Sequence, residues 1–505
     1  MTLDRPLRVL FMASEAAGFA KTGGLADVAT ALPRALHKRG IDVRVAIPCY
    51  NSARKAWRAP EPTEVGVDIH VGPHSYPGRV SWTYLPKSEV PIYLIEQQHF
   101  FERDDPGAGR GIYNFTDHGN KRDYPDNAER FVFFTRACLE MLPKLGFWPD
   151  VIHCNDWQTG LVPVYARDLY GRAKPEYYQP RMLLTIHNIA YQGQFSPSTM
   201  AVTNLDASLY SHDKLESHGT LNFLKAGIVY SDWINTVSPR YAEEIQTSAF
   251  GCGMESTLAS RRHRLCGILN GVDYDDWNPA TDPHLPAKFD VNNVFEFKPE
   301  NKAALQRYFH LPEWPRTPML GVVSRLAEQK GIELILEVAE QMIGRDVQFV
   351  ILGEGDQHYH YWLQQFRDRY PQRVGVHFGF SDPLAHLIEA GADMFLMPSK
   401  YEPAGLNQLY SLRYGTVPIV RDVGGLHDTI FDTTESNLTA SRATGFRFGL
   451  YNGHALLGAI DRAVHVYRNR TDVWKQLVQN GMRQDWSWDR SAGEYENLYR
   501  RMIGV

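Results

Sequence analysis

The sequence predicts an α/β protein made of two doubly wound domains, each with a parallel sheet between layers of helices. Three observations indicate this fold. Short β-branched or aromatic runs alternate with amphipathic helical segments nearly from end to end. These runs are continuously apolar, as expected for strands that are buried on both faces. The chain has 505 residues, which is too long for one ordinary core and suits two domains of roughly 200–250 residues each.

The first half of the chain contains six predicted strands. Its opening stretch resembles a secretory signal, with two arginines before an apolar run, but Glu15 interrupts that run and favours a buried strand. Two helices are expected between strands, Ala26–His37 from its apolar spacing and Asp126–Leu142 from its Asp-Asn cap. The six strands are Arg8–Ala13, Asp42–Pro48, Pro91–Glu96, Asp150–His153, Met182–His187 and Trp233–Val237.

The second half repeats this pattern after a boundary near residues 261–264. A polar, proline-rich surface loop, Asn278–Pro286, follows that boundary, and a helix with one apolar face, Trp488–Met502, closes the chain. Ligands of doubly wound folds bind at the carboxyl ends of the strands, so we expect the chemistry in the loops that follow them. The predicted strands are Met319–Ser324, Gln348–Leu352, Gly375–Phe378, Met394–Pro398 and Pro418–Arg421, and the predicted helices are Ile332–Ile343, Leu384–Ala390 and Gly405–Tyr414.

Composition argues against several classes of protein. Lys and Arg number 53 and Asp and Glu number 58, a formal charge of −5, so we expect no nucleic-acid binding. No apolar run reaches the roughly 18 residues of a membrane-spanning helix, so no membrane partner is expected. The five scattered cysteines contain no C-x-x-C pair, which indicates a reduced, cytoplasmic protein with neither a disulfide framework nor a zinc site.

A lysine-glycine loop stands between the first predicted strand and the first predicted helix. In Lys21-Thr22-Gly23-Gly24 the glycines let the backbone approach a ligand, the helix N-terminus offers free N–H groups to an anion, and Lys21 adds a positive charge. The loop is not a P-loop, because its lysine precedes the glycines. A lone Gly-Gly pair is also common in plain connecting turns, so both interpretations stay open here.

Two cations follow the predicted strand Met319–Ser324. Arg325 and Lys330 are placed to converge on a phosphate group, the first as a planar fork and the second as a point charge. Two solvated surface cations are the alternative, and the position at a strand exit favours the phosphate.

A carboxylate, Glu402, follows the predicted strand Met394–Pro398. At such a position it can hold sugar hydroxyls or stabilise positive charge at a reacting carbon. It can also be a helix N-terminal carboxylate that the helix dipole favours, and the two roles are compatible.

Polar residues also end two strands of the first half. Asp156 lies in the stretch His153–Gln158, and His187 and Asn188 lie in Thr185–Gly193. A lone histidine at a strand end is usually a structural residue, so His187 taken singly carries little weight.

Several other signatures are absent or incomplete. Asp273-Tyr274-Asp275 has the D-x-D form of a metal–nucleotide-sugar site, but no second ligand cluster is in view, so we expect a solvated loop and no metal. No G-x-S-x-G nucleophile elbow exists. Gly353-Glu354-Gly355 lacks the third glycine of a dinucleotide fingerprint, which argues against a nicotinamide dehydrogenase.

Taken in order, the motifs closely resemble those of the bacterial glycogen synthase and plant starch synthase family. The family signature K-T-G-G-L-A-D-V stands at Lys21–Val28, five further motifs follow in the family's order, and the resemblance covers essentially the whole chain. The five are T-I-H-N-I-A-Y-Q-G at Thr185–Gly193, L-N-G-V-D at Leu269–Asp273, S-R-L…Q-K-G at Ser324–Gly331, E-P-x-G-L-N-Q-L-Y at Glu402–Tyr410 and S-W-D-R-S-A at Ser487–Ala492.

The resemblance implies the GT-B fold, in which two Rossmann-like domains face each other across a cleft. Because the family's last helix crosses back, it implies an acceptor-side domain of residues 1–263 plus 485–505 and a nucleotide-sugar-binding domain of residues 264–484. The implied enzyme is a retaining hexosyltransferase that moves glucose from ADP-glucose to the non-reducing-end O4 of an α-1,4-glucan. The implied partners are ADP-glucose or ADP and glycogen, starch or a malto-oligosaccharide, with no metal or other cofactor.

The resemblance also implies residue roles. Arg325 and Lys330 should neutralise the leaving diphosphate, and the Lys21 loop should close on the phosphates or the acceptor. No protein nucleophile is evident, so the family-level expectation is front-face attack, with a leaving phosphate oxygen taking the acceptor proton. The predicted catalytic residues are Lys21, Asp156, His187, Arg325, Lys330 and Glu402, and the predicted substrate-binding residues are Glu15, Gly23, Gly24, Tyr113, Asn188, Asn270, Phe380, Gly405 and Leu406.

Three positions depart from common family patterns. Ala404 stands where many relatives have cysteine, so that thiol is not essential here. Phe380 stands where relatives often have a tyrosine against the adenine, so stacking would survive without a hydroxyl contact. Tyr410 replaces the second glutamate of many other retaining GT-B enzymes, which favours the starch and glycogen synthases.

Two alternatives stay open beside this function. One is a GT-B transferase that uses UDP-glucose, and the other is a catalytically weak glucan-binding or priming protein. The resemblance favours a bacterial cytoplasm, or the plastid stroma for a trimmed plant or algal enzyme.

Overall fold

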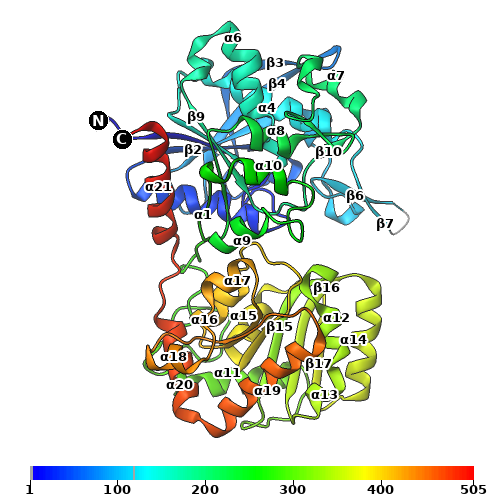
Figure 1. Ribbon diagram of the computed structural model, residues 1–505, viewed down its shortest axis with the longest axis vertical. Helices are drawn as coiled ribbons and strands as arrows, with labels where there is room; N and C mark the ends of the chain where they lie inside the picture. The colour runs from blue at the N-terminus through cyan, green and yellow to red at the C-terminus, as the bar shows by residue number, and fades with distance from the viewer. Residues whose placement is uncertain (1–3, 118–119) are drawn as a thin grey trace. The chain divides into compact units, whose positions relative to one another are not determined.

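The computed structural model describes residues 4–117 and 120–505, which form two compact units (Figure 1). The first unit consists of the residues up to Val237, Ala242–Ile268 and Trp488–Val505. The second consists of Ser238–Tyr241 and Leu269–Ser487. Each unit is built around one large sheet with helices against it, so the predicted fold class of two doubly wound α/β domains is confirmed.

The sheet of the first unit contains every strand that the sequence predicts for this half. Its core strands are parallel, and β1 pairs with β2 on one side and β8 on the other. The strand order is β14-β13-β9-β8-β1-β2-β5-β4-β3. The bounds are β1 Arg8–Met12, β2 Asp42–Pro48, β3 Glu61–Val71, β4 His74–Tyr84, β5 Pro91–Glu96, β8 Val151–Asn155, β9 Arg181–Ile186, β13 Trp233–Thr236 and β14 Leu265–Gly267.

At both edges, this sheet contains strands that the sequence did not predict. At one edge β3 and β4 form an antiparallel hairpin in which apolar and polar residues alternate, because only one face of β3 is buried. At the other edge β14 pairs in parallel with β13. Residues 265–267 therefore belong to the first unit, whereas the predicted second domain begins at residue 264.

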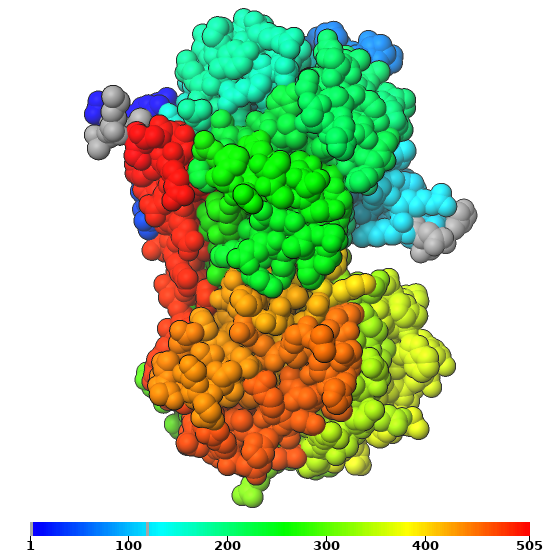
Figure 2. Space-filling view, in the orientation of Figure 1, coloured from blue at the N-terminus to red at the C-terminus, as the bar shows by residue number. Residues whose placement is uncertain are grey.

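The last helix of the chain, α21 (Trp488–Ile503), packs on the first unit. It lies beside α1 (Gly24–Lys38), and Arg39 pairs with Asp489 at 3.2 Å and with Glu496 at 2.9 Å. Figures 1 and 2 show α21 in red along the flank of this unit. Residues from the end of the chain therefore complete the core of the domain that the first residues begin.

The sheet of the second unit is parallel throughout, in the order β17-β16-β15-β18-β19-β20. All four residues of β18 are buried, which requires helices on both faces of the sheet. The strand bounds are β15 Met319–Leu326, β16 Gln348–Gly355, β17 Val374–Phe378, β18 Met394–Met397, β19 Val417–Arg421 and β20 Phe446–Phe448. The helices include α11 Val294–Tyr308, α14 Gln357–Arg369, α15 Asp382–Gly391, α19 Gly453–Asn469 and α20 Thr471–Arg483.

Two predicted helices of this unit differ from the structure. The segment Ile332–Ile343 forms two short helices, α12 (Ile332–Glu337) and α13 (Ala339–Ile343), because Val338 between them leaves helical geometry with φ −108° and ψ 11°. The helix expected from Gly405 begins at Asn407 as α16 (Asn407–Arg413), because Gly405 has φ +65°. No helix within residues 4–117 and 120–505 is long and apolar enough to cross a membrane.

Candidate active site

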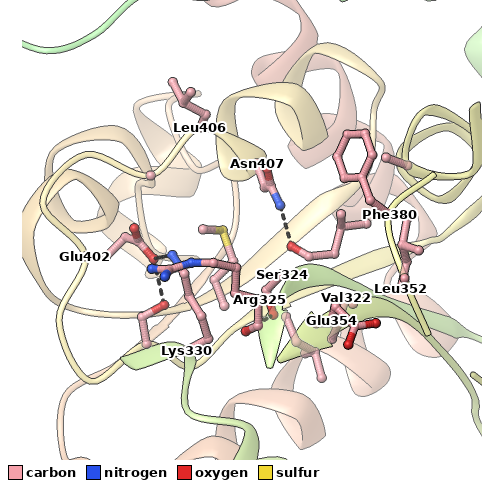
Figure 3. A pocket seen from close by; sticks show the side chains of 18 residues that line it. Val322, Ser324, Arg325, Lys330, Leu352, Glu354, Phe380, Glu402, Leu406 and Asn407 are labelled. Atoms are coloured by element: carbon pink, nitrogen blue, oxygen red, sulfur yellow. Dashed lines mark hydrogen bonds and ion pairs between the residues drawn. The ribbon is translucent and has the colours of Figure 1, made fainter. Parts of the chain in front are cut away.

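A cavity of about 330 Å³ opens in the second unit, where β15, β16 and β18 end (Figure 3). Its position at the carboxyl ends of parallel strands is the one expected for a ligand site in this fold class. Six predicted site residues line it together: Arg325, Lys330, Phe380, Glu402, Gly405 and Leu406.

Lys330 and Glu402 form an ion pair inside this cavity. Nζ of Lys330 lies 2.7 Å from Oε2 of Glu402, and the side chains are only 20% and 6% exposed. The Ser399 hydroxyl donates a second hydrogen bond to the same oxygen at 2.9 Å. These two donors hold the Glu402 carboxylate in place through Oε2, and Oε1 forms no hydrogen bond within the described part of the chain.

Gly331 explains how Lys330 reaches this position. The chain turns there with φ +69°, and a Cβ at this residue would lie 2.1 Å from the carbonyl oxygen of Pro398. Only glycine allows the backbone after β15 to pass this close to the end of β18. The close passage brings Lys330 beside the loop that carries Glu402.

Arg325 shares this end of the cavity without a carboxylate partner. Its side chain is exposed and donates to Oε1 of Gln329 at 3.1 Å, and it forms no ion pair within the described part of the chain. Figure 3 shows its guanidinium directed toward Lys330 and Glu402. An arginine without a carboxylate partner, beside the Lys330–Glu402 pair, provides a local positive site for a small anion.

Phe380 lies at the opposite side of the cavity and is 88% exposed (Figure 3). A large aromatic side chain this exposed at a cavity rim offers a stacking surface for a planar ligand group. Asn270, by contrast, does not line the cavity. It is 7% exposed, and its Oδ1 is buried without a hydrogen-bond partner among residues 4–117 and 120–505. A buried acceptor of this kind can accept a hydrogen bond from a ligand hydroxyl.

In the first unit, Asp156 and His187 are in direct contact where β8 and β9 end. The His187 backbone N–H donates to Oδ1 of Asp156 at 2.7 Å. Asp156 adopts φ +56° and ψ −174°, a strained conformation for a residue with a Cβ. Burial raises the pKa of Asp156 to about 7, with backbone N–H donors opposing the shift. A strained carboxylate with a pKa this close to neutrality is typical of functional sites.

The ring of His187 is neutral and oriented. Burial lowers its pKa to about 3, and Nε2 lies 2.9 Å from Oδ1 of Asn155. The Asn155 amide donates to the carbonyl of Met12 at 2.9 Å, which assigns its oxygen to face His187. Nε2 therefore carries the proton, and Nδ1 keeps a lone pair that can accept a hydrogen bond from a hydroxyl group.

Glu15 holds the lysine-glycine loop from inside the protein. Its carboxylate accepts hydrogen bonds from the Thr22 backbone N–H at 2.5 Å and from the Thr22 hydroxyl at 3.0 Å. Burial raises its pKa, while these donors act in the opposite direction. These contacts to Thr22 give Glu15 the geometry of a residue that positions the loop.

The loop itself is open. A Cβ on Gly23 or on Gly24 would meet nothing within 4 Å, so the protein's own packing does not demand glycine at either position. The space that the absent side chains leave is available to a ligand at the N-terminus of α1. Nζ of Lys21 pairs with Asp27 at 2.7 Å, on the same loop and helix.

Two weaker predictions have internal partners in the structure. The Tyr113 hydroxyl lies 2.6 Å from the Ser14 hydroxyl and 3.4 Å from Glu15, so it belongs to the Glu15 network. Oδ1 of Asn188 accepts from the Ala190 N–H at 3.0 Å and stabilises a turn.

Sequence reasoning missed three supporting residues: Asn155, Ser399 and Asn407. Each adjoins or lies close to a predicted site residue, and each fixes another group. Asn407, for example, donates to the carbonyl of Val323 at 2.6 Å and ties the start of α16 to β15 (Figure 3). The available signal was their position: Asn155 lies in the stretch His153–Gln158, Asn407 lies in the motif Glu402–Tyr410, and Ser399 lies three residues before Glu402.

Comparisons with known proteins agree over the whole chain. Residues 8–260 match the family model of the starch synthase catalytic domain, and residues 310–476 match that of group 1 glycosyl transferases. A glycogen synthase of Syntrophotalea carbinolica is 45% identical and covers 98% of this chain and 99% of its own. One of Geobacillus thermodenitrificans is 43% identical and covers 98% of each.

Solved structures give the same result. The catalytic domain of Starch Synthase IV from Arabidopsis thaliana, bound to ADP and acarbose, is 33% identical with a TM-score of 0.87, and the match covers 99% of this chain and 100% of that one. A sucrose-phosphate synthase from Thermosynechococcus elongatus shares the fold at 16% identity, with a TM-score of 0.56 over 99% of each chain. The chain therefore belongs to the glycogen synthase and starch synthase family of glycosyltransferases, and it has the GT-B fold.

Proposed function

We propose that this protein transfers glucose from ADP-glucose to the non-reducing-end O4 of an α-1,4-glucan, with retention of the α configuration. The observation that carries the proposal is the grouping of Arg325, Lys330 and Glu402 in one cavity at the strand ends. The relatives named glycogen synthase and the starch synthase structure that holds ADP and acarbose support the same donor and acceptor classes.

Arg325 and Lys330 act on the leaving group. As the bond between C1 of glucose and the diphosphate oxygen breaks, negative charge grows on the phosphate. Arg325 offers a planar fork of donors and Lys330 offers a point charge beside it, so both stabilise this charge more in the transition state than in the bound donor. Phe380 stacks on the adenine of the nucleotide.

The transfer itself needs no protein nucleophile. The acceptor O4 attacks C1 on the face that the diphosphate leaves, and the departing phosphate oxygen takes the O4 proton. Glu402, held in place by its pairing with Lys330, lies against the donor glucose and stabilises the positive charge that develops near C1. We propose that no metal takes part in this step.

The polar residues of the first unit bind sugar. His187 accepts a hydrogen bond from a glucose hydroxyl through Nδ1, and Asp156 lies near the reacting sugar. Glu15 acts through the Lys21–Gly24 loop, which its carboxylate holds in position. Glu15 is therefore a positioning residue in this proposal.

The deciding experiment measures glucose incorporation into glycogen by the purified protein, with ADP-glucose and UDP-glucose compared side by side in the presence of EDTA. We expect fast transfer from ADP-glucose that EDTA does not reduce. A preference for UDP-glucose would overturn the donor, and a requirement for added metal would overturn the metal-free step. If neither donor supported transfer while glucan still bound, the protein would be a glucan-binding or priming protein.

A further inference from the structure

Two histidines and one aspartate of the second unit converge near the start of α15. Asp382 lies in the first turn of α15, His386 lies one turn further along the same helix, and His284 comes from the loop before α11. Their ligand-type atoms all lie within 4.8 Å of one another. None of the three lines the cavity that contains Arg325 and Glu402.

His386 is held with one ring nitrogen free for a ligand. Its Nδ1 lies 2.7 Å from Oδ2 of Asp282, and the Tyr414 hydroxyl donates to the same oxygen at 2.6 Å. Because Nδ1 is engaged by the Asp282 side chain, Nε2 is the ring nitrogen that is left to bind a metal ion.

The direction of that lone pair is fixed by packing. The His386 side chain is only 6% exposed, and its ring lies parallel to Trp277 with centroids 3.8 Å apart. Trp277 in turn stacks on Tyr410 at 3.8 Å. Nε2 has no hydrogen-bond partner among the described residues, so a buried ring presents an unpartnered ligand atom to the cluster.

The distances suit a small metal ion. Nε2 of His386 and Nε2 of His284 each lie 3.9 Å from Oδ2 of Asp382. Ligand atoms around a tetrahedral ion with bonds of about 2.0 Å stand about 3.3 Å apart, so both histidines must move closer to Asp382, and the distance between the two histidines, which is within 4.8 Å, must close to the same value. The Asp382 and His284 side chains are 58% and 32% exposed and can make this adjustment.

We propose that His284, Asp382 and His386 bind one zinc ion, with water as the fourth ligand and Asp282 orienting His386. Two imidazoles and a carboxylate form a donor set that zinc prefers, and a carboxylate behind a ligating histidine is the usual outer partner. Bound zinc would tie the loop that carries His284 to α15. The site goes beyond the proposed glucosyl transfer and does not depend on it.

The sequence alone predicts no zinc site, because it contains no C-x-x-C pair and no second ligand cluster beside Asp273-Tyr274-Asp275. The residues of the proposed site are far apart in the chain: Asp282 and His386, for example, are separated by 104 positions. Only folding brings the loop against α15.

Zinc binding to the full-length protein tests the proposal, measured in competition with a chromogenic chelator. We expect one zinc ion per chain, and we expect Asp382→Asn and His284→Ala each to weaken binding at least about tenfold. Both residues are at least partly exposed, so both variants should fold. His454→Ala, at an exposed histidine on α19, is the matched control and should bind zinc like the parent protein.

Cobalt(II) supplies a second, spectroscopic test. We expect the visible bands of tetrahedral cobalt in the parent protein and their loss in both variants. No zinc binding, equal binding in the two variants, or a sulfur-to-cobalt charge-transfer band that places the metal on a cysteine such as the exposed Cys252 would each overturn the proposal. These measurements do not use activity, so they are independent of whether glucosyl transfer occurs.

Discussion

Burial sets the protonation states of the two polar residues at the ends of β8 and β9. It lowers the pKa of His187 to about 3 and raises that of Asp156 to about 7. Both groups are therefore biased toward their neutral forms, and an uncharged site suits sugar hydroxyls, which bind through hydrogen bonds. The two shifts have opposite effects on how stability varies with pH.

Asp156→Asn should make the protein lose more stability on acidification. The folded pKa of Asp156 lies above its unfolded value, so this carboxyl adds stability as the pH falls from about 7 toward about 4. The folded pKa of His187 lies below its unfolded value, so His187 removes stability as the pH falls below about 6.5. Asparagine at position 156 abolishes the stability that the carboxyl adds in acid and leaves the stability that His187 removes.

Denaturant unfolding at pH 7 and pH 5 measures this difference. We expect the loss of unfolding free energy between the two pH values to be larger in Asp156→Asn by on the order of 1 kcal/mol. An equal or smaller loss would contradict the raised pKa of Asp156.

Arg325→Ala should reduce turnover by about 10²-fold or more, because it removes a charge that acts in the transition state. Steady-state glucose transfer with saturating ADP-glucose measures the effect. Arg367→Ala, at a side chain on α14 that lies outside the cavity, should have near-normal turnover. Near-normal turnover in Arg325→Ala would remove Arg325 from the leaving-group role.

At the scale of elements, α21 is built into the first unit through polar contacts in its core. The Tyr499 hydroxyl lies 2.8 Å from Nδ1 of His153, and the Asn235 amide donates to the Tyr495 hydroxyl at 3.0 Å. His153, Tyr495 and Tyr499 are all fully buried. The buried polar side chains of β8 and β13 thus obtain hydrogen-bond partners from a helix at the end of the chain.

Tyr499→Phe tests this dependence. The substitution keeps the ring but leaves Nδ1 of His153 buried without a partner, which should lower the unfolding free energy by about 1–3 kcal/mol. Thermal and denaturant unfolding measure the loss. Tyr361→Phe, at a 58% exposed side chain, should leave stability within about 0.5 kcal/mol of the parent protein. Equal stability in both variants would show that the hydrogen bond adds nothing.

At the scale of the whole molecule, the second unit is an insertion in the chain of the first. Residues Leu269–Ser487 carry a six-stranded parallel sheet and their own hydrophobic core, and they contain every residue that lines the cavity. Doubly wound domains of this size commonly fold alone.

The fragment 269–487 should therefore fold cooperatively and bind ADP without catalysing transfer. Circular dichroism during thermal unfolding reports the cooperativity, and isothermal titration with ADP reports binding. The same fragment with Arg325→Ala should bind ADP more weakly, because one phosphate contact is lost. A fragment that unfolds without a cooperative transition would show that the second unit needs the first to fold.

Much of this architecture follows from local sequence. Continuous apolar runs are enough to predict the core strands, because a strand buried on both faces has no polar position to interrupt it. The β3–β4 hairpin was missed because only one face is buried, and its alternating residues form no continuous run. The family motifs likewise contain most of the predicted site residues, because each motif is a short contiguous segment, whereas Glu15, Tyr113, Asp156 and Phe380 lie outside them.

The folded chain alone decides which distant residues meet. The pairing of Lys330 with Glu402 joins residues 72 positions apart, and that of Asp282 with His386 joins residues 104 apart. The pKa of Asp156 also arises only in the folded chain. Its shift comes from burial, and burial depends on the elements that pack around β8, not on the residues next to Asp156 in the sequence. Short-range patterns encode strands, turns and motifs, whereas contacts, burial and protonation arise only when the chain closes into a core.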